Sequence, residues 1–201
     1  AAGQFYYDYG AVNTGCHVID ELETRLHFHT LVPGSYYIIN NALNEAEILV
    51  RKFTLNVKAL VDAYGVKNKS GTYQWDNFSA NVKTLYDRSD YTEKIEVVSI
   101  TMKNENFDIN QPIGGKNRQW CTHTYESCGG DSANSPYRDY WGASTYDSDG
   151  KDEKFLKISY SQRKPFIVGK SDSSDNFEYG ENGPSLMAIH AIKSLNKKAI
   201  S

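Results

Sequence analysis

The chain has 201 residues, of which 39% are hydrophobic and 13% aromatic, a composition that suits a folded globular domain and excludes a disordered chain. The formal net charge of -3 and the lack of a dense basic run exclude a general nucleic-acid binder, so no nucleic-acid partner is expected. No apolar run approaches the ~20 residues that a membrane span needs, which predicts a soluble chain.

Residues 1–40 show no consistent helical or strand pattern and are interpreted as an N-terminal extension. The segment CHVIDELETRLHFH, residues 16–29, fits either a short helix or an edge strand. Pro33 and Gly34 follow it and predict a turn.

The clearest helical pattern covers residues 42–64, where apolar residues recur at helical spacing. Asn40 or Asn41 can cap this helix, and Gly65 supplies its C-terminal stop. The middle of the segment, FTLNVKAL, also alternates and contains branched residues. A helix that gives way to a strand near Arg51 is therefore an open alternative.

Two shorter elements complete the first half of the chain. Residues 76–86 predict a short helix, because their apolar residues recur on one side. The segment EKIEVVSITMK, residues 93–103, predicts a strand, since branched residues suit a pleated, half-buried surface. The helical region is therefore placed at residues 42–86.

Residues 93–201 form a β-rich region that contains a long loop at 104–150, and such loops in compact domains are usually functional. Apolar and polar residues alternate at 156–160, and KPFIVG (164–169) and SLMAIHAI (185–192) are further strand candidates. The sequence predicts one α+β domain, an antiparallel β-sandwich or sheet with one or two flanking helices.

The three cysteines indicate in which cellular compartment the protein is located, because disulfides form in oxidising compartments. Cys121 and Cys128 have C-x6-C spacing across a Gly-Gly turn and predict a disulfide, which leaves Cys16 as the odd thiol. Asn68 and Asn77 lie in N-x-S sequons, and the start AAGQFYYDYG fits a mature N-terminus left by cleavage. These features predict a secreted or extracytoplasmic protein.

Candidate metal ligands occur in several places without a complete ligand set. His27 and His29 would lie on the same face of a strand, but no third ligand has suitable spacing. Cys121-x-His123 matches no CxxC pair. The segment YDSDGKDE at 146–153 resembles a calcium loop but lacks the glycine and the distal glutamate at the EF-hand positions, so a solvated turn is expected. We therefore expect no metal and no cofactor.

The sequence favours a non-enzyme, because it has no G-x-S-x-G elbow, no cysteine-protease signature and no phosphate-binding loop. A hydrolase that uses Cys16 as nucleophile, with His123 or His190 as base, remains an alternative.

Aromatic residues crowd into the polar segment 118–146, in a chain that has 15 tyrosines. Tyr and Trp rings stack on sugars and hold quaternary ammonium groups, and Arg pairs with phosphate or carboxylate. The alternative is that these rings pack beneath a long surface loop. The predicted ligand-binding residues are Trp120, Tyr137, Arg138, Tyr140 and Trp141.

The order and spacing of SPYRDYW (135–141), KPF (164–166) and SLMAIHAI (185–192) resemble those of the actinoporin-like cytolysins. The resemblance implies a β-sandwich with flanking helices, an aromatic cluster that holds phosphocholine headgroups, and an amphipathic helix that perforates membranes. The amphipathic segment of this chain lies at 42–64 instead of at the N-terminus. The headgroup-binding residues that the resemblance implies are Tyr137, Tyr140 and Trp141.

The sequence thus predicts a secreted recognition protein that binds a cell-surface glycan, a lipid headgroup or a cell-surface protein through a disulfide-closed aromatic loop, with peripheral membrane contact left open. Such a protein would be a toxin, a colonisation or adhesion factor, and so a virulence factor. Two alternatives stay open: the hydrolase above, and a structural or partner-binding protein that docks through a Tyr-rich face.

Overall fold

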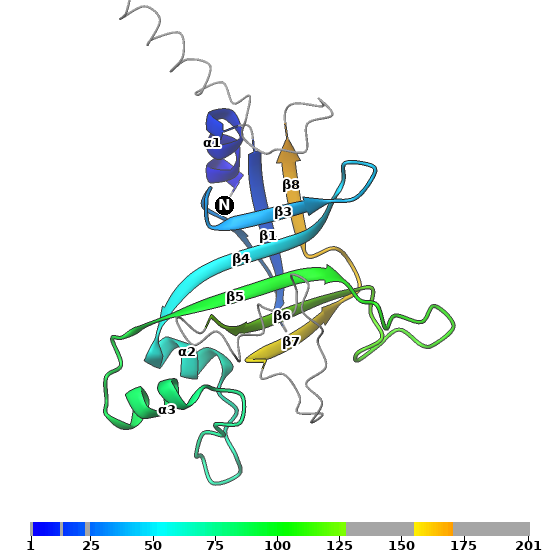
Figure 1. The fold of residues 1–201 in the computed structure, drawn as a ribbon. Helices are drawn as coiled ribbons and strands as arrows, with labels where there is room; N and C mark the ends of the chain where they lie inside the picture. Colours follow the sequence, from blue (N-terminus) through cyan, green and yellow to red (C-terminus); the bar gives the residue numbers. More distant parts are fainter. Residues whose placement is uncertain (1, 13, 23–24, 128–154, 171–201) are drawn as a thin grey trace, which may run out of the picture. The chain divides into compact units, whose positions relative to one another are not determined.

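The computed structural model describes residues 2–12, 14–22, 25–127 and 155–170 (Figure 1). The fold is α+β with antiparallel sheets, as predicted. Its elements in chain order are α1 (Ala2–Val12), β1 (Thr14–Leu22), β2 (Arg25–Thr30), β3 (Tyr36–Asn40), β4 (Ala46–Asn56), α2 (Val57–Tyr64), α3 (Ala80–Asp87), β5 (Lys94–Lys103), β6 (Trp120–Glu126), β7 (Lys157–Ser161) and β8 (Phe166–Lys170).

The chain divides into two compact units. The first comprises Ala1–Leu49 and Ser161–Ser201, and the second comprises Val50–Tyr160, so the boundary falls within β4. Within the described residues, one sheet has the strand order β2-β1-β8 and the other has the order β3-β4-β5-β6-β7.

In the first unit, α1 packs against β1. The Phe5 ring of α1 stacks on the His17 ring of β1, with the ring centroids 4.5 Å apart and an interplanar angle of 10°. Gly15 lies on the same face of β1, two residues before His17. A Cβ atom added at Gly15 would come within 2.9 Å of the Phe5 ring, so the absence of a side chain there lets the helix approach the strand.

The second unit has an apolar core beneath its two helices. The side chain of Asn56 caps α2 by accepting from the amide of Ala59, and Ser79 caps α3 by accepting from Val82. The Glu126 carboxylate at the end of β6 accepts a 3.0 Å hydrogen bond from the Ser79 amide and so ties the start of α3 to the sheet. The buried core residues are Val57, Leu60, Val61, Phe78, Val82, Ile95, Val97 and Leu156.

Several predicted elements are confirmed. The strand predicted at 93–103 is β5, and the turn at Pro33 is present, with Gly34 at a φ of +90°. The helix predicted at 76–86 is α3, although it begins only after the Ser79 cap. The strand candidates at 156–160 and 164–169 correspond to β7 and β8, whereas SLMAIHAI lies outside the described residues.

The helix predicted over residues 42–64 is wrong for most of its length. Asn41 does not cap a helix; its side chain accepts from the amides of Leu43 and Glu45 in a tight turn before β4. The helix begins only at Val57 and ends before Gly65, as predicted. The alternative had the order reversed, because the strand precedes the helix. The branched residues of β4 lie between two neighbouring strands, β3 and β5, and this pairing overrides their helical spacing.

Several elements were missed. Residues 16–29 form the antiparallel pair β1 and β2 instead of a single helix or edge strand, preceded by the helix α1. The predicted loop at 104–150 contains the strand β6, whose seven residues include no Gly, Pro, Asn or Asp. Residues on both faces of β6 are buried, so apolar and polar residues do not alternate along it as they do in a strand with one exposed face. No helix in the described part of the chain is long and apolar enough to cross a membrane.

The contact between α1 and β1 can be tested at Gly15. We expect Gly15→Ala to lower the free energy of unfolding by ~1–3 kcal/mol, because the new methyl group would overlap the Phe5 ring. Gly3→Ala is the control: nothing lies within 4 Å of its added Cβ, and this change in the first turn of α1 should not lower the free energy of unfolding. Urea unfolding measures both; equal effects would contradict this packing.

Candidate functional site

The loop between β5 and β6, residues 104–119, is ordered by two asparagine side chains. The Asn117 side chain donates to the carbonyls of Asp108, Gln111 and Pro112 and accepts from the Asp108 amide. The Asn104 side chain donates to two further loop carbonyls, those of Lys116 and Arg118. These bonds hold the loop in one conformation without a hydrophobic core of its own.

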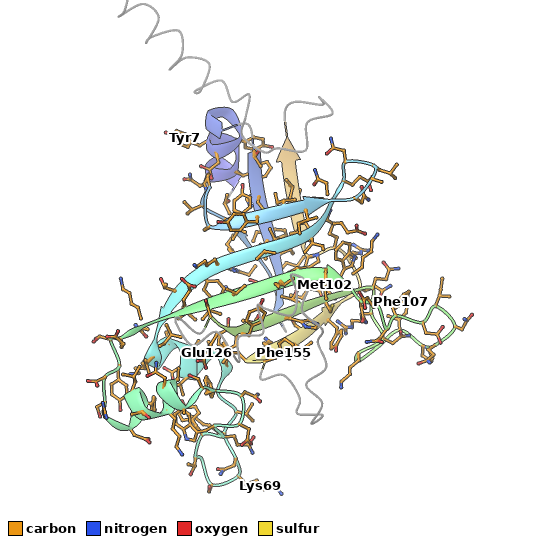
Figure 2. All side chains as sticks on the ribbon, in the orientation of Figure 1. Tyr7, Lys69, Met102, Phe107, Glu126 and Phe155 are labelled. Carbon is orange, nitrogen blue, oxygen red and sulfur yellow. The ribbon has the colours of Figure 1, made fainter. Side chains whose placement is uncertain are left out.

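This loop exposes apolar side chains. Ile109 is 84% exposed and Ile113 is 64% exposed, whereas Phe107 in the same loop is half-buried. Figure 2 shows Phe107 on the loop that extends from the ends of β5 and β6. We call residues 104–119 the isoleucine loop. Exposed apolar side chains on a rigid support are typical of a protein-binding surface.

A second apolar surface lies on the sheet β2-β1-β8, on the face that α1 partly covers. In the antiparallel register Ile19 is opposite Phe28, and Ile167 is opposite His17. Leu26 lies two residues before Phe28 and therefore on the same face. Leu26, Phe28 and Ile167 are all about half exposed. These four apolar residues, Ile19, Leu26, Phe28 and Ile167, lie on the same face of the three strands, where Ile167 has His17 as its direct neighbour.

Tyrosines on α1 add to the exposed aromatic surface of the first unit. Tyr6 and Tyr7 are both largely exposed, and Figure 2 shows Tyr7 pointing away from the sheet. Their neighbour Asp8 is instead buried and accepts a hydrogen bond from the Gln4 amide group.

The opposite face of the same sheet brings together three side chains that can ligate a metal. Asp20 of β1 is directly opposite His27 of β2, and His29 lies two residues further along β2. One ligand atom from each side chain lies within 4.8 Å of the others. The sequence indicated the two histidines but not the carboxylate, because Asp20 joins them only through the strand register.

The predicted site residues in the second unit are mostly beyond the structure. Tyr137, Arg138, Tyr140, Trp141 and Cys128 lie outside the described residues.

Trp120 lies on β6 and is only 8% exposed, so its ring is part of the interior rather than of an open loop. Tyr125 of the same strand is fully buried, and the Arg118 guanidinium donates to the Tyr160 carbonyl. The aromatic residues that open the predicted recognition loop are therefore packing residues of a strand.

Of the residues of the alternative catalytic pair, Cys16 is buried and His123 is half-buried. Cys16 has no exposed surface, and His190 lies outside the described residues. Burial lowers the pKa of His123, whose ring packs edge-on against Phe155. Burial, with a smaller contribution from Glu105, raises the pKa of Cys121, so its buried thiol stays protonated and is a poor nucleophile. The predicted Cys121–Cys128 disulfide stays a prediction.

Comparison with known proteins identifies the family of this chain. A family model described as "Bacteriophage head to tail connecting protein" matches residues 1–200, and the chain belongs to this family. It is also similar to the portal protein of Salmonella phage epsilon15, with 25% identity over 162 residues. The match covers 81% of this chain but 24% of that relative, so the chain spans about a quarter of the relative's length.

Family membership overturns the predicted function. The resemblance to actinoporin-like cytolysins was wrong, and so were the secreted recognition protein, the toxin, adhesion and virulence roles, and the alternative hydrolase. The glycan, lipid-headgroup and cell-surface partners and the extracytoplasmic location were wrong for the same reason. Short aromatic motifs recur in unrelated proteins, and two cysteines with suitable spacing do not establish an oxidising compartment.

The bracing of the isoleucine loop can be tested at Asn117. Asn117→Ala removes four hydrogen bonds, two of them half-buried and two exposed, and should destabilise the loop locally by ~1–3 kcal/mol. Hydrogen exchange of the loop amides should then accelerate roughly 10- to 100-fold without a change in the core strands. Asn106→Ala, the same change at an exposed position of the loop, is the control; equal acceleration in both variants would refute the bracing role.

The half-buried His123 predicts a pH dependence of stability. The unfolded chain, with an ordinary histidine pKa of ~6.5, takes up a proton before the folded protein does, because the folded pKa is lowered. Stability from this group is complete above pH ~6.5 and is lost as the pH falls through the lowered pKa. His123→Gln should therefore flatten the decline of unfolding free energy between pH 7.5 and 5; parallel curves would contradict the burial effect.

Proposed function

We propose that this chain is a structural part of the connection between the head and the tail of a bacteriophage particle, and that it acts by binding other phage proteins. The observation that carries this proposal is the family match, which covers residues 1–200 and therefore both compact units. A protein that connects two assemblies works through contact surfaces, so exposed apolar surfaces on ordered elements are the features to expect.

The isoleucine loop supports this proposal. Burying an exposed isoleucine side chain contributes ~1.5–3 kcal/mol, so Ile109 and Ile113 together would contribute ~3–6 kcal/mol to a protein contact. The asparagine hydrogen bonds order the loop before binding, which reduces the entropy lost when the contact forms.

The chemistry of the loop defines the partner that it fits. The loop carries two acidic residues, Glu105 and Asp108, and two basic ones, Lys116 and Arg118, so its charges balance. We infer that Ile109 and Ile113 enter an apolar groove on another protein of the head–tail connection. Because such a contact is mainly apolar, salt should weaken it little.

Particle assembly tests both the function and the surface. The full-length protein that contains these residues is supplied in trans to a phage whose own copy is deleted, and joined head–tail particles are counted by electron microscopy. We expect deletion to abolish joined particles and the wild-type protein to restore them. The double variant Ile109→Asp/Ile113→Asp should lower restoration more than tenfold, since charged side chains cannot enter an apolar groove.

The matched control is Ile109→Val/Ile113→Val, which keeps the surface apolar and should restore joined particles. Thermal unfolding of all variants must agree within a few degrees, because the substituted side chains are exposed. Joined particles in the deletion strain would refute the function itself. Normal restoration by the aspartate variant would refute only the docking role of the loop.

A further inference from the structure

The sheet β2-β1-β8 carries a candidate metal site that is independent of the proposed connector function. The antiparallel register places Asp20 opposite His27, and Val18 opposite His29. Side chains of directly opposite residues point to the same face of a sheet, and so do side chains two residues apart. The Asp20 carboxylate and both imidazole rings therefore emerge on one face, over two adjacent strands.

The distances bring the three side chains close to ligation geometry. The Asp20 Oδ2 atom is 3.4 Å from Nδ1 of His29 and 4.0 Å from Nδ1 of His27. The two imidazole centroids are 5.7 Å apart, and the rings are tilted by 34°. Ligand atoms on a tetrahedral Zn²⁺ ion, with bonds of ~2.1 Å, lie ~3.4 Å from one another, so rotations of exposed side chains suffice to close the site.

The surroundings allow a metal ion to enter. The side chains of Asp20 and His27 are 52% and 51% exposed, and that of His29 is 24% exposed. The more buried His29 is held in place by the sheet, whereas the other two side chains remain accessible to ions from solution. The two paired strands thus provide a rigid base for three converging ligands.

We propose that Asp20, His27 and His29 bind a divalent transition-metal ion such as Zn²⁺. Two neutral imidazole nitrogens and one carboxylate oxygen suit Zn²⁺, Co²⁺ or Ni²⁺, whereas Mg²⁺ and Ca²⁺ prefer oxygen ligands only. Three protein ligands leave a fourth tetrahedral position for water. The bound ion links β1 to β2 by bonds that the strand hydrogen bonds do not provide, so it stabilises the folded first unit.

A site without metal would behave differently. Asp20 and the two histidines would then be neighbouring side chains on one face of the sheet, and the stability of the first unit would not respond to metal. Metal titration separates the two cases directly.

The test titrates the metal-free chain with Zn²⁺ by calorimetry and with Co²⁺ by visible absorption. We expect one saturable site of micromolar or tighter affinity, and Co²⁺ absorption typical of tetrahedral coordination. The thermal midpoint should rise with Zn²⁺ and return with a chelator. Asp20→Asn, His27→Gln and His29→Gln should each weaken binding at least about tenfold.

Two controls match these variants. Glu21→Gln neutralises the adjacent carboxylate, which points to the other face of β1, and His123→Gln removes a histidine of the second unit; both should bind Zn²⁺ like the wild type. Should a site variant fail to fold, imidazole NMR signals of the wild type give the answer, because Zn²⁺ must shift those of His27 and His29. Absence of saturable binding, or binding unchanged in His27→Gln and His29→Gln, would overturn the proposal.

Discussion

The register of β1 between its two neighbours is the constraint on which the first unit depends. When a strand is paired on both sides, the register determines to which face of the sheet each of its side chains points. A shift of the register by one residue would move every side chain to the opposite face. In the observed register one face carries Gly15 and His17, which receive α1, followed by Ile19. The other face carries buried Cys16 and, further along, Asp20. One pairing therefore positions the helix, the apolar residues of that face and the side chains proposed to bind a metal ion.

In the second unit, hydrogen bonds from a few polar side chains determine the conformation of the helix starts and of the isoleucine loop. Asn56 and Ser79 satisfy the amide groups at the starts of α2 and α3, and Glu126 connects the α3 cap to β6. Asn104 and Asn117 order the isoleucine loop, where no apolar core is available. Hydrogen bonds to buried or half-buried backbone groups are costly to lose, so these few residues define the conformation of long irregular segments. Order in this unit extends from its core to the surface proposed to bind a partner.

The family could not be recognised from local motifs, and the function proposed for this chain depends on contact surfaces instead. A catalytic or metal-binding motif fixes residue types at set spacings, whereas a contact surface needs only exposed apolar area of suitable shape. The sequence therefore drew attention to aromatic residues. Trp120 and Tyr125 are interior residues of β6, and the residues that offer apolar area instead, Ile109 and Ile113, have no distinctive pattern. Their exposure is a property of the folded loop.

The sequence by itself determined those helices and strands whose residue pattern favours the same conformation as their tertiary contacts do. The branched run of β5, the capped helix α3 and the stop of α2 at Gly65 follow from local sterics and hydrogen bonding, and so does the α+β class.

Tertiary structure decided the rest, because the deciding contacts join residues far apart in the chain. Neighbouring strands make β4 extended despite its helical spacing, and burial on both faces conceals β6. Asp20 lies close to His27 and His29 only because the register of β1 against β2 brings the three side chains to one face. The spacing of these residues in the sequence does not show this.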